Sequence, residues 1–133
     1  MATKTIRFEP TNVGDEILLD NKAKIVSDLV WSNSAPTSGF NNQTLSIDLS
    51  SYRFLFGMIA VMNSDATKYY TVLFKIGAGD QYCFVSEGNA RSYRRFTPSS
   101  TGIAITSAYT ATFGNAVGIN NNYCIPQYFY GIK

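Results

Sequence analysis

Two arginines and a tyrosine on one predicted strand form the clearest candidate binding site in this sequence. Because side chains alternate along a strand, the segment ARSYRRF places Arg91, Tyr93 and Arg95 on one face. The alternate residues share the opposite face: Ser92, Arg94 and Phe96. A guanidinium binds phosphate or carboxylate bidentately, and a tyrosine ring stacks on a sugar ring, so an anionic or sugar ligand suits this face. The pattern also fits a solvated strand or an oligomer interface, with arginines paired to Asp80 or Glu87.

Tyrosine is the second feature that indicates binding, because it offers a large contact area and a hydrogen-bonding tip at low entropic cost. Four tyrosines lie near predicted loops or strand ends and are candidate ligand contacts: Tyr69, Tyr82, Tyr109 and Tyr123. Aromatic residues are favoured in strands for packing reasons as well, so a purely structural role stays open. Trp31 is interpreted as a core residue.

The residue types needed for catalysis or metal binding are scarce. Without histidine, one chain has no Ser-His-Asp or Cys-His triad and no histidine-ligated zinc. Among nine acidic residues, Asp80 and Glu87 are the least implausible pair for glycoside hydrolysis. Cys83 and Cys124 fit neither a disulfide framework nor a metal knuckle, and we expect free, buried thiols. We therefore expect no enzymatic activity, metal or cofactor, although a site assembled between chains stays open.

Composition predicts one compact domain. The chain has 133 residues, 45% of them hydrophobic and only 15% charged, which is unlike a disordered protein. The net charge of +2 is too small to indicate the basic surface that nucleic-acid-binding proteins use to contact phosphates. The longest apolar stretch, residues 54–62, is too short for a membrane-spanning helix, and the first residues show no signal peptide. Synthesis in a reducing cytosol is expected.

A hydrophobic period of two predicts an all-β protein, an antiparallel β-sandwich of jelly-roll type. The predicted strands are 29–33, 43–49, 53–62, 68–76, 81–87, 91–96, 102–108, 109–114 and 125–132. Residues 15–30 fit either a helix, from their apolar spacing, or a hairpin turning at Asp20 and Asn21; the hairpin is favoured.

The strand at 53–62 is apolar on both faces. Phe54, Phe56 and Met58 point one way, whereas Leu55 and Ile59 point the other. The outer face of a single-domain sandwich is normally wet, so the second face needs a cover. A subunit interface is the favoured cover, and a long loop is the alternative.

Two sequence boxes show a resemblance to a known family. Residues 28–52 read DLVWSNSAPTSGFNNQTLSIDLSSY, and the chain closes with CIPQYFYGIK at 124–133. Both resemble the C-terminal domain of phage tail-fibre and receptor-binding proteins, especially of phages and prophages of gut bacteria. The boxes frame residues 28–133, and the middle is only loosely similar.

The resemblance implies a non-catalytic virion protein at the tail-fibre tip, a homotrimer that recognises a bacterial surface glycan or protein. The alternative is a structural virion component, such as a capsid decoration, baseplate or trimerisation module. Residues 1–27 would form an attachment or linker segment to other virion proteins, in a fragment of a longer fibre or a small separate protein. The implied location is the virion tail, assembled in the host cytoplasm, without membrane insertion.

Overall fold

The computed structural model describes residues 6–7, 16–19 and 24–133, and these residues form antiparallel strands and no helix. The strands are β1 (Ile6–Arg7), β2 (Glu16–Leu19), β3 (Lys24–Ser32), β4 (Gln43–Ser46), β5 (Phe54–Met62), β6 (Asp65–Lys75), β7 (Gln81–Glu87), β8 (Ala90–Ser99), β9 (Gly102–Ile105), β10 (Tyr109–Thr112), β11 (Gly118–Ile119) and β12 (Tyr123–Ile132). The prediction of an all-β antiparallel protein is confirmed.

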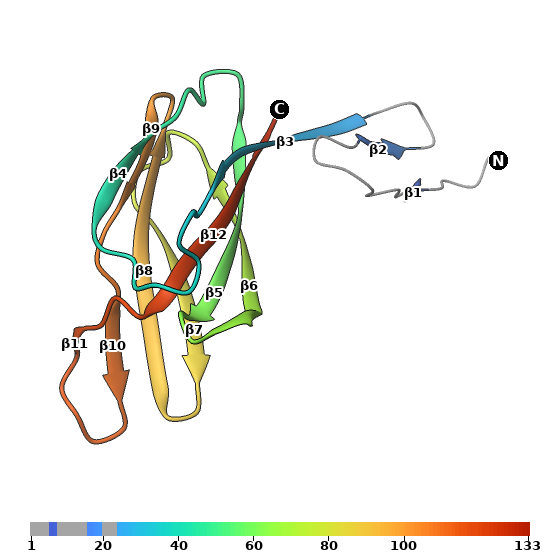
Figure 1. Cartoon of the computed structure of the whole chain (residues 1–133). Helices are drawn as coiled ribbons and strands as arrows, with labels where there is room; N and C mark the ends of the chain where they lie inside the picture. Colours follow the sequence, from blue (N-terminus) through green and yellow to red (C-terminus); the bar gives the residue numbers. More distant parts are fainter. Residues whose placement is uncertain (1–5, 8–15, 20–23) are drawn as a thin grey trace.

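The strands form two sheets that pack face to face (Figure 1). Sheet I has the order β1-β2-β3-β12-β5-β6, and β1 and β2 extend it beside the beginning of β3, beyond the two packed layers. Sheet II has the order β11-β10-β8-β9-β4, with β7 on the other edge of β8. In sheet II, β10 pairs with the first half of β8 and β9 with its last residues, so β9 and β10 follow one another along the same edge.

Aromatic side chains join the two sheets in the core. Phe74 and Phe129 of sheet I and Phe96 of sheet II are fully buried. The ring centroids of Phe74 and Phe96 are 5.0 Å apart, and those of Phe96 and Phe129 are 6.1 Å apart. Trp31 packs at the edge of this cluster, half-buried, with its ring 5.4 Å from that of Phe129. Burial of these rings supplies the main driving force for packing the sheets.

The segment at 15–30 forms a hairpin, as favoured from the sequence, and not a helix. β2 pairs antiparallel with β3, with Glu16 opposite Val26 and Leu18 opposite Lys24. The turn at Asp20 and Asn21 lies outside the described residues. β3 runs across residue 27, the expected end of the attachment segment.

Several predicted strands are too long. The strand expected at 43–49 ends at Ser46, because Ile47 and Leu49 donate backbone hydrogen bonds to the carbonyls of Thr101 and Ser100 outside the regular ladder. β9 ends at Ile105, before the expected residue 108, and β10 ends at Thr112. Conversely, Gly118–Ile119 lies outside the predicted strands and forms β11 of sheet II.

The two sequence boxes pack against each other. β3 and β12 are neighbours in sheet I, and the Asn33 side chain donates a hydrogen bond of 2.9 Å to the Pro126 carbonyl. The Tyr52 ring lies over Gly131, where an added Cβ would come within 2.6 Å of it, and the Tyr52 hydroxyl donates to Asp28 at 2.7 Å. The far-apart boxes therefore form one structural unit around the middle of sheet I.

The apolar residues of β5 divide between two faces as expected. Leu55 and Ile59 are fully buried between the sheets. On the outer face of sheet I, the register aligns four residues across β3, β12, β5 and β6: Leu29, Tyr130, Phe56 and Leu73. We call these four residues the outer row of sheet I. Leu73 is 59% exposed and Phe56 is half-buried, so no loop within the described residues covers this row completely.

Candidate functional site

A row of aromatic side chains crosses the outer face of sheet II. Phe84 of β7 lies opposite Tyr93 of β8, Tyr93 lies opposite Tyr109 of β10, and Tyr109 lies opposite Ile119 of β11. Tyr82 stands beside this row on β7. We call the four aromatic residues the aromatic platform: Tyr82, Phe84, Tyr93 and Tyr109.

The rings of the platform contact one another. Tyr93 and Tyr109 are stacked, with centroids 5.5 Å apart and an interplanar angle of 18°. Phe84 lies 5.8 Å from Tyr93 and 6.1 Å from Tyr82. Phe84 is 65% exposed, although a large apolar side chain gains free energy from burial. Strand alternation causes this exposure, because Cys83 and Val85 face the core.

Two arginines flank the platform, and they differ in their partners. Arg95 donates from Nη1 to Asp80 Oδ2 at 3.2 Å, and the hydroxyl of Thr97 donates to the other oxygen of the same carboxylate at 2.7 Å. Arg91 lies opposite Ser86 and Ala111 and is exposed. In the described part of the chain, no acidic side chain forms a salt bridge with Arg91. The pairing of Arg95 with Asp80 is the alternative that the sequence left open. Arg91 has no such partner among the described residues and is accessible to a ligand.

The third arginine of the strand is a core residue. Arg94 is fully buried and donates to the backbone carbonyls of Thr106 at 2.6 Å and Tyr123 at 3.1 Å. Its guanidinium carbon lies 5.3 Å from the centroid of the Phe40 ring. Burial lowers the pKa of Arg94 to about 10, so the side chain is still a cation at neutral pH. Arg94 joins β8 to the loop after β9 and to the start of β12, and it has no surface to offer a ligand.

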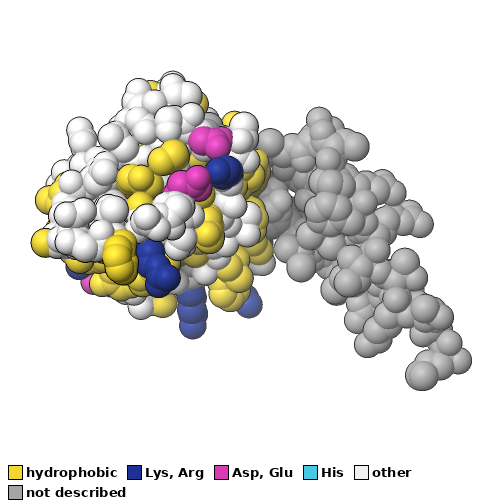
Figure 2. All heavy atoms as spheres, turned by 90° about the horizontal axis from the view of Figure 1, so that it is seen from below, with side chains coloured by type: hydrophobic (Ala, Val, Ile, Leu, Met, Phe, Trp, Pro, Cys, Tyr) yellow, Lys and Arg dark blue, Asp and Glu magenta, His cyan; other side chains and the backbone are white. Residues whose placement is uncertain are grey.

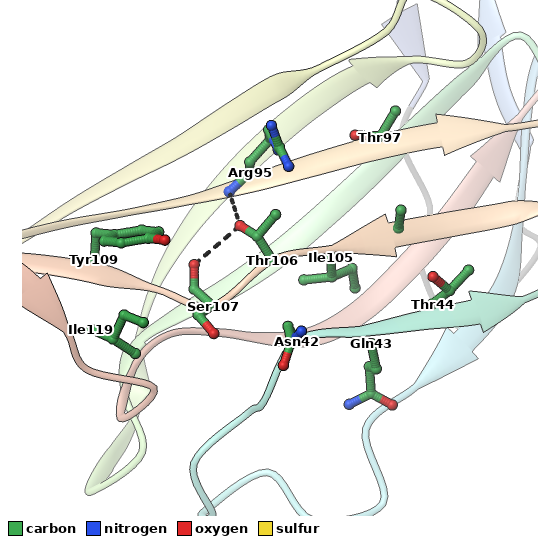
Figure 3. A pocket seen from close by; sticks show the side chains of 11 residues that line it. Asn42, Gln43, Thr44, Arg95, Thr97, Ile105, Thr106, Ser107, Tyr109 and Ile119 are labelled. Carbon is green, nitrogen blue, oxygen red and sulfur yellow. Dashed lines mark hydrogen bonds between the residues drawn. The ribbon is translucent and has the colours of Figure 1, made fainter.

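A hollow of about 450 Å³ with a mixed polar and apolar lining adjoins the platform (Figure 3). Its lining comes from five strands of sheet II, β4, β8, β9, β10 and β11, and from the loops beside them: Asn42, Gln43, Thr44, Arg95, Thr97, Ala104, Ile105, Thr106, Ser107, Tyr109 and Ile119. It forms where β9 gives way to β10 along β8. There the Arg95 amide donates to the Thr106 hydroxyl at 3.3 Å in place of a regular ladder bond. Tyr109 and Arg95 belong to both the hollow and the site around the platform.

The structure brings together five of the six predicted ligand-binding residues. Five of them share the outer face of sheet II: Arg91, Tyr93, Arg95, Tyr82 and Tyr109. Figure 2 shows one end of the molecule, where hydrophobic, cationic and acidic side chains share the surface. The sixth, Tyr69, lies opposite Ala60 on β6 of sheet I, apart from the other five.

Tyr123, the remaining tyrosine candidate, lies apart from the platform, and two residues of the row across sheet II were not predicted. Tyr123 is half-buried at the start of β12, away from the platform, where its carbonyl accepts from Arg94. Sequence reasoning missed Phe84 and Ile119. The signal for Phe84 was a strand with apolar residues on both faces, the same pattern that drew attention to β5.

The acidic residues and thiols do not form a reactive cluster in the described chain. Asp80 precedes β7 and Glu87 ends it, about 20 Å apart at the usual rise of a strand, so they cannot flank one glycosidic bond within a chain. Glu87 instead accepts from Lys68 at 2.9 Å. Cys83 and Cys124 are free and buried, as expected, and hydrogen bonding between them together with burial raises the pKa of the Cys124 thiol.

The described residues contain neither a cluster suited to a metal ion nor a membrane-spanning helix. No group of three or more histidine, cysteine, aspartate or glutamate side chains is arranged to hold a metal ion. The same part of the chain has no helix of a length and hydropathy that would span a membrane.

Comparisons with protein-family models, with curated proteins and with solved structures find no match to this chain.

Proposed function

We propose that this chain is a non-catalytic virion protein that recognises the surface of a bacterial host at the tip of a phage tail fibre. The observation that carries the proposal is the stacked pair of half-buried Tyr93 and exposed Tyr109 on the outer face of sheet II, flanked by Arg91. Rings held by strand pairing on both sides are already ordered before a ligand arrives, so binding costs little conformational entropy. The two sequence boxes that resemble phage tail-fibre domains support the same function.

The ligand proposed for the platform is a glycan, with a surface protein as the second possibility. Aromatic faces stack on sugar rings, and an arginine at the edge binds a carboxylate or phosphate of the same glycan. A single exposed site of this kind binds weakly. Three sites on one homotrimer, repeated around a virion, would raise the overall avidity by orders of magnitude.

The proposed homotrimer uses the opposite side of the molecule. The outer row of sheet I, which crosses the sheet from Leu29 on β3 to Leu73 on β6, gives an apolar surface on which a second copy of the chain packs. This arrangement leaves the aromatic platform on sheet II free for the host. The same apolar face favours the second candidate function, a structural virion component whose exposed apolar surfaces are all contacts with other virion proteins.

Glycan binding separates the two functions. The purified chain is applied to an array of bacterial surface polysaccharides and oligosaccharides, and hits are measured by titration calorimetry. We expect binding that Tyr93→Ala lowers at least tenfold and that the matched variant Tyr69→Ala leaves unchanged. Absence of binding to every glycan would favour the structural component, and equal loss in both variants would place the site elsewhere.

A further inference from the structure

The hollow and the aromatic platform form one continuous surface. Tyr109 stacks on Tyr93 with one side of its ring and takes part in the lining of the hollow. Ile119, opposite Tyr109 on β11, also lines the hollow. A molecule seated in the hollow is therefore in reach of the platform without any rearrangement of the strands.

The lining of the hollow mixes polar and apolar groups and has little free charge. Arg95 is its only ionisable cation, and that guanidinium is paired with Asp80, whose second oxygen is held by Thr97. The other polar groups are uncharged amides and hydroxyls, among them those of Asn42, Thr44 and Ser107. Among the described residues, these three side chains have no hydrogen-bond partner within the protein, so they remain available as donors and acceptors.

An uncharged, hydroxyl-rich molecule matches this lining better than an anion does. Neutral amides and hydroxyls exchange hydrogen bonds with sugar hydroxyls at no cost in charge desolvation. An anion would have to compete with the Asp80 carboxylate for Arg95 and would lie close to that negative charge. Arg91, which forms no salt bridge among the described residues, lies on the side of the Tyr93–Tyr109 pair away from Arg95.

The length of the surface exceeds one sugar ring. Ile119, Tyr109, Tyr93 and Phe84 stand on four adjacent strands. Neighbouring strands are about 4.8 Å apart, so the row is about 14 Å long. A single pyranose would cover only part of it.

We infer that the hollow is a subsite for an uncharged sugar residue of a linear oligosaccharide, whose following residues stack along Tyr109, Tyr93 and Phe84. This inference rests on the proposed glycan-binding function and adds the location, charge and minimum length of the ligand. An acidic group, where the glycan has one, lies toward Arg91 and not in the hollow.

The test is a variant that fills the hollow. Ala104 lines it and is exposed, so Ala104→Leu blocks the space without touching the core. Thr71→Leu is the control, because Thr71 is an exposed strand residue of sheet I. Affinities of the full chain are measured by titration calorimetry for a glycan found on the array and for its fragments of one to six sugar residues. Thermal unfolding verifies that both variants are folded.

We expect affinity to rise at least tenfold from the monosaccharide to the trisaccharide. Ala104→Leu should remove most of this gain, and Thr71→Leu should remove none. If Tyr93→Ala abolishes binding but Ala104→Leu has no effect, the platform binds glycans and the inference about the hollow is wrong. The inference is equally wrong if a monosaccharide binds as tightly as its oligomers, or if only fragments with an acidic group on every residue bind. If the chain binds no glycan at all, the proposed function fails and the inference fails with it.

Discussion

The rings of Tyr93 and Tyr109 stack at 5.5 Å because β8 and β10 place the two residues directly opposite each other. Directly opposed residues on one face are the closest side-chain neighbours in an antiparallel sheet. The pair is therefore fixed by the register of two strands and not by a flexible loop. A ligand that stacks on it meets a surface whose side-chain entropy has already been lost on folding.

Arg91 should determine the response to acidic glycans. Because Arg91 has no acidic partner among the described residues, Arg91→Ala is expected to weaken binding of a uronate-containing oligosaccharide by roughly tenfold. Binding of the neutral counterpart should stay within a factor of two or so, since it makes no ionic contact. Calorimetry at low and high salt measures both, and an equal loss for the two ligands would contradict the assignment.

Arg94 should contribute to stability and not to binding. Arg94→Ala leaves the carbonyls of Thr106 and Tyr123 without donors and opens a cavity, and we expect a loss of about 3 kcal/mol in the free energy of unfolding. Arg94→Met should recover part of this loss, because its side chain fills the space that alanine leaves empty. The surface variant Arg91→Ala should change stability by less than about 0.5 kcal/mol. Urea denaturation gives all three values, and an Arg94→Ala protein as stable as the parent would refute the assignment.

Gly131 should not tolerate a side chain. An added Cβ would lie 2.6 Å from the Tyr52 ring, which must then move, and overpacking of this kind costs about 2 kcal/mol. Gly118→Ala is the control, since nothing lies within 4 Å of its added Cβ. Thermal unfolding should show a lower midpoint for Gly131→Ala only. Equal midpoints would mean that Tyr52 shifts freely and does not hold the two sequence boxes together.

Alkaline pH should destabilise the protein in part through Tyr52. Its hydrogen bond to the Asp28 carboxylate raises the pKa of Tyr52. Above about pH 10, tyrosine in the unfolded chain loses its proton while folded Tyr52 keeps it, so unfolding releases a proton and the free energy of unfolding falls as pH rises. Below that pH the contribution is constant. Urea midpoints between about pH 9 and about pH 11 should therefore fall less steeply in Tyr52→Phe than in the parent protein.

The solution mass should be that of a trimer. Light scattering is expected to give about three times the 14.7 kDa of one chain. Phe56→Asp places a charge in the outer row of sheet I and should shift the protein toward the monomer without abolishing folding, because Phe56 lies outside the core. A monomeric parent protein would remove the proposed role of this face.

The all-β antiparallel class and three of the four platform residues could be predicted from local sequence patterns. Period-two alternation depends only on local backbone geometry, which is why it separated Arg91, Tyr93 and Arg95 from Ser92, Arg94 and Phe96. It could not fix where strands end, since Ser46 and Ile105 are ends set by hydrogen bonds to distant residues. Nor could it decide whether Arg95 is paired, because Asp80 meets the side chains of Arg95 and Thr97 only through the pairing of β7 with β8.

Tertiary structure alone decided which aromatic residues meet. Tyr69 and Tyr82 look equivalent in sequence, yet one belongs to sheet I and the other to sheet II, and nothing local to either residue specifies the sheet. The hollow likewise depends on the succession of β9 and β10 along one edge of β8, which is a long-range arrangement. Alternation predicts which residues of one strand face the same way. Which residues are neighbours across strands depends on the chain topology. The sequence specifies that topology only through the packing of the whole domain.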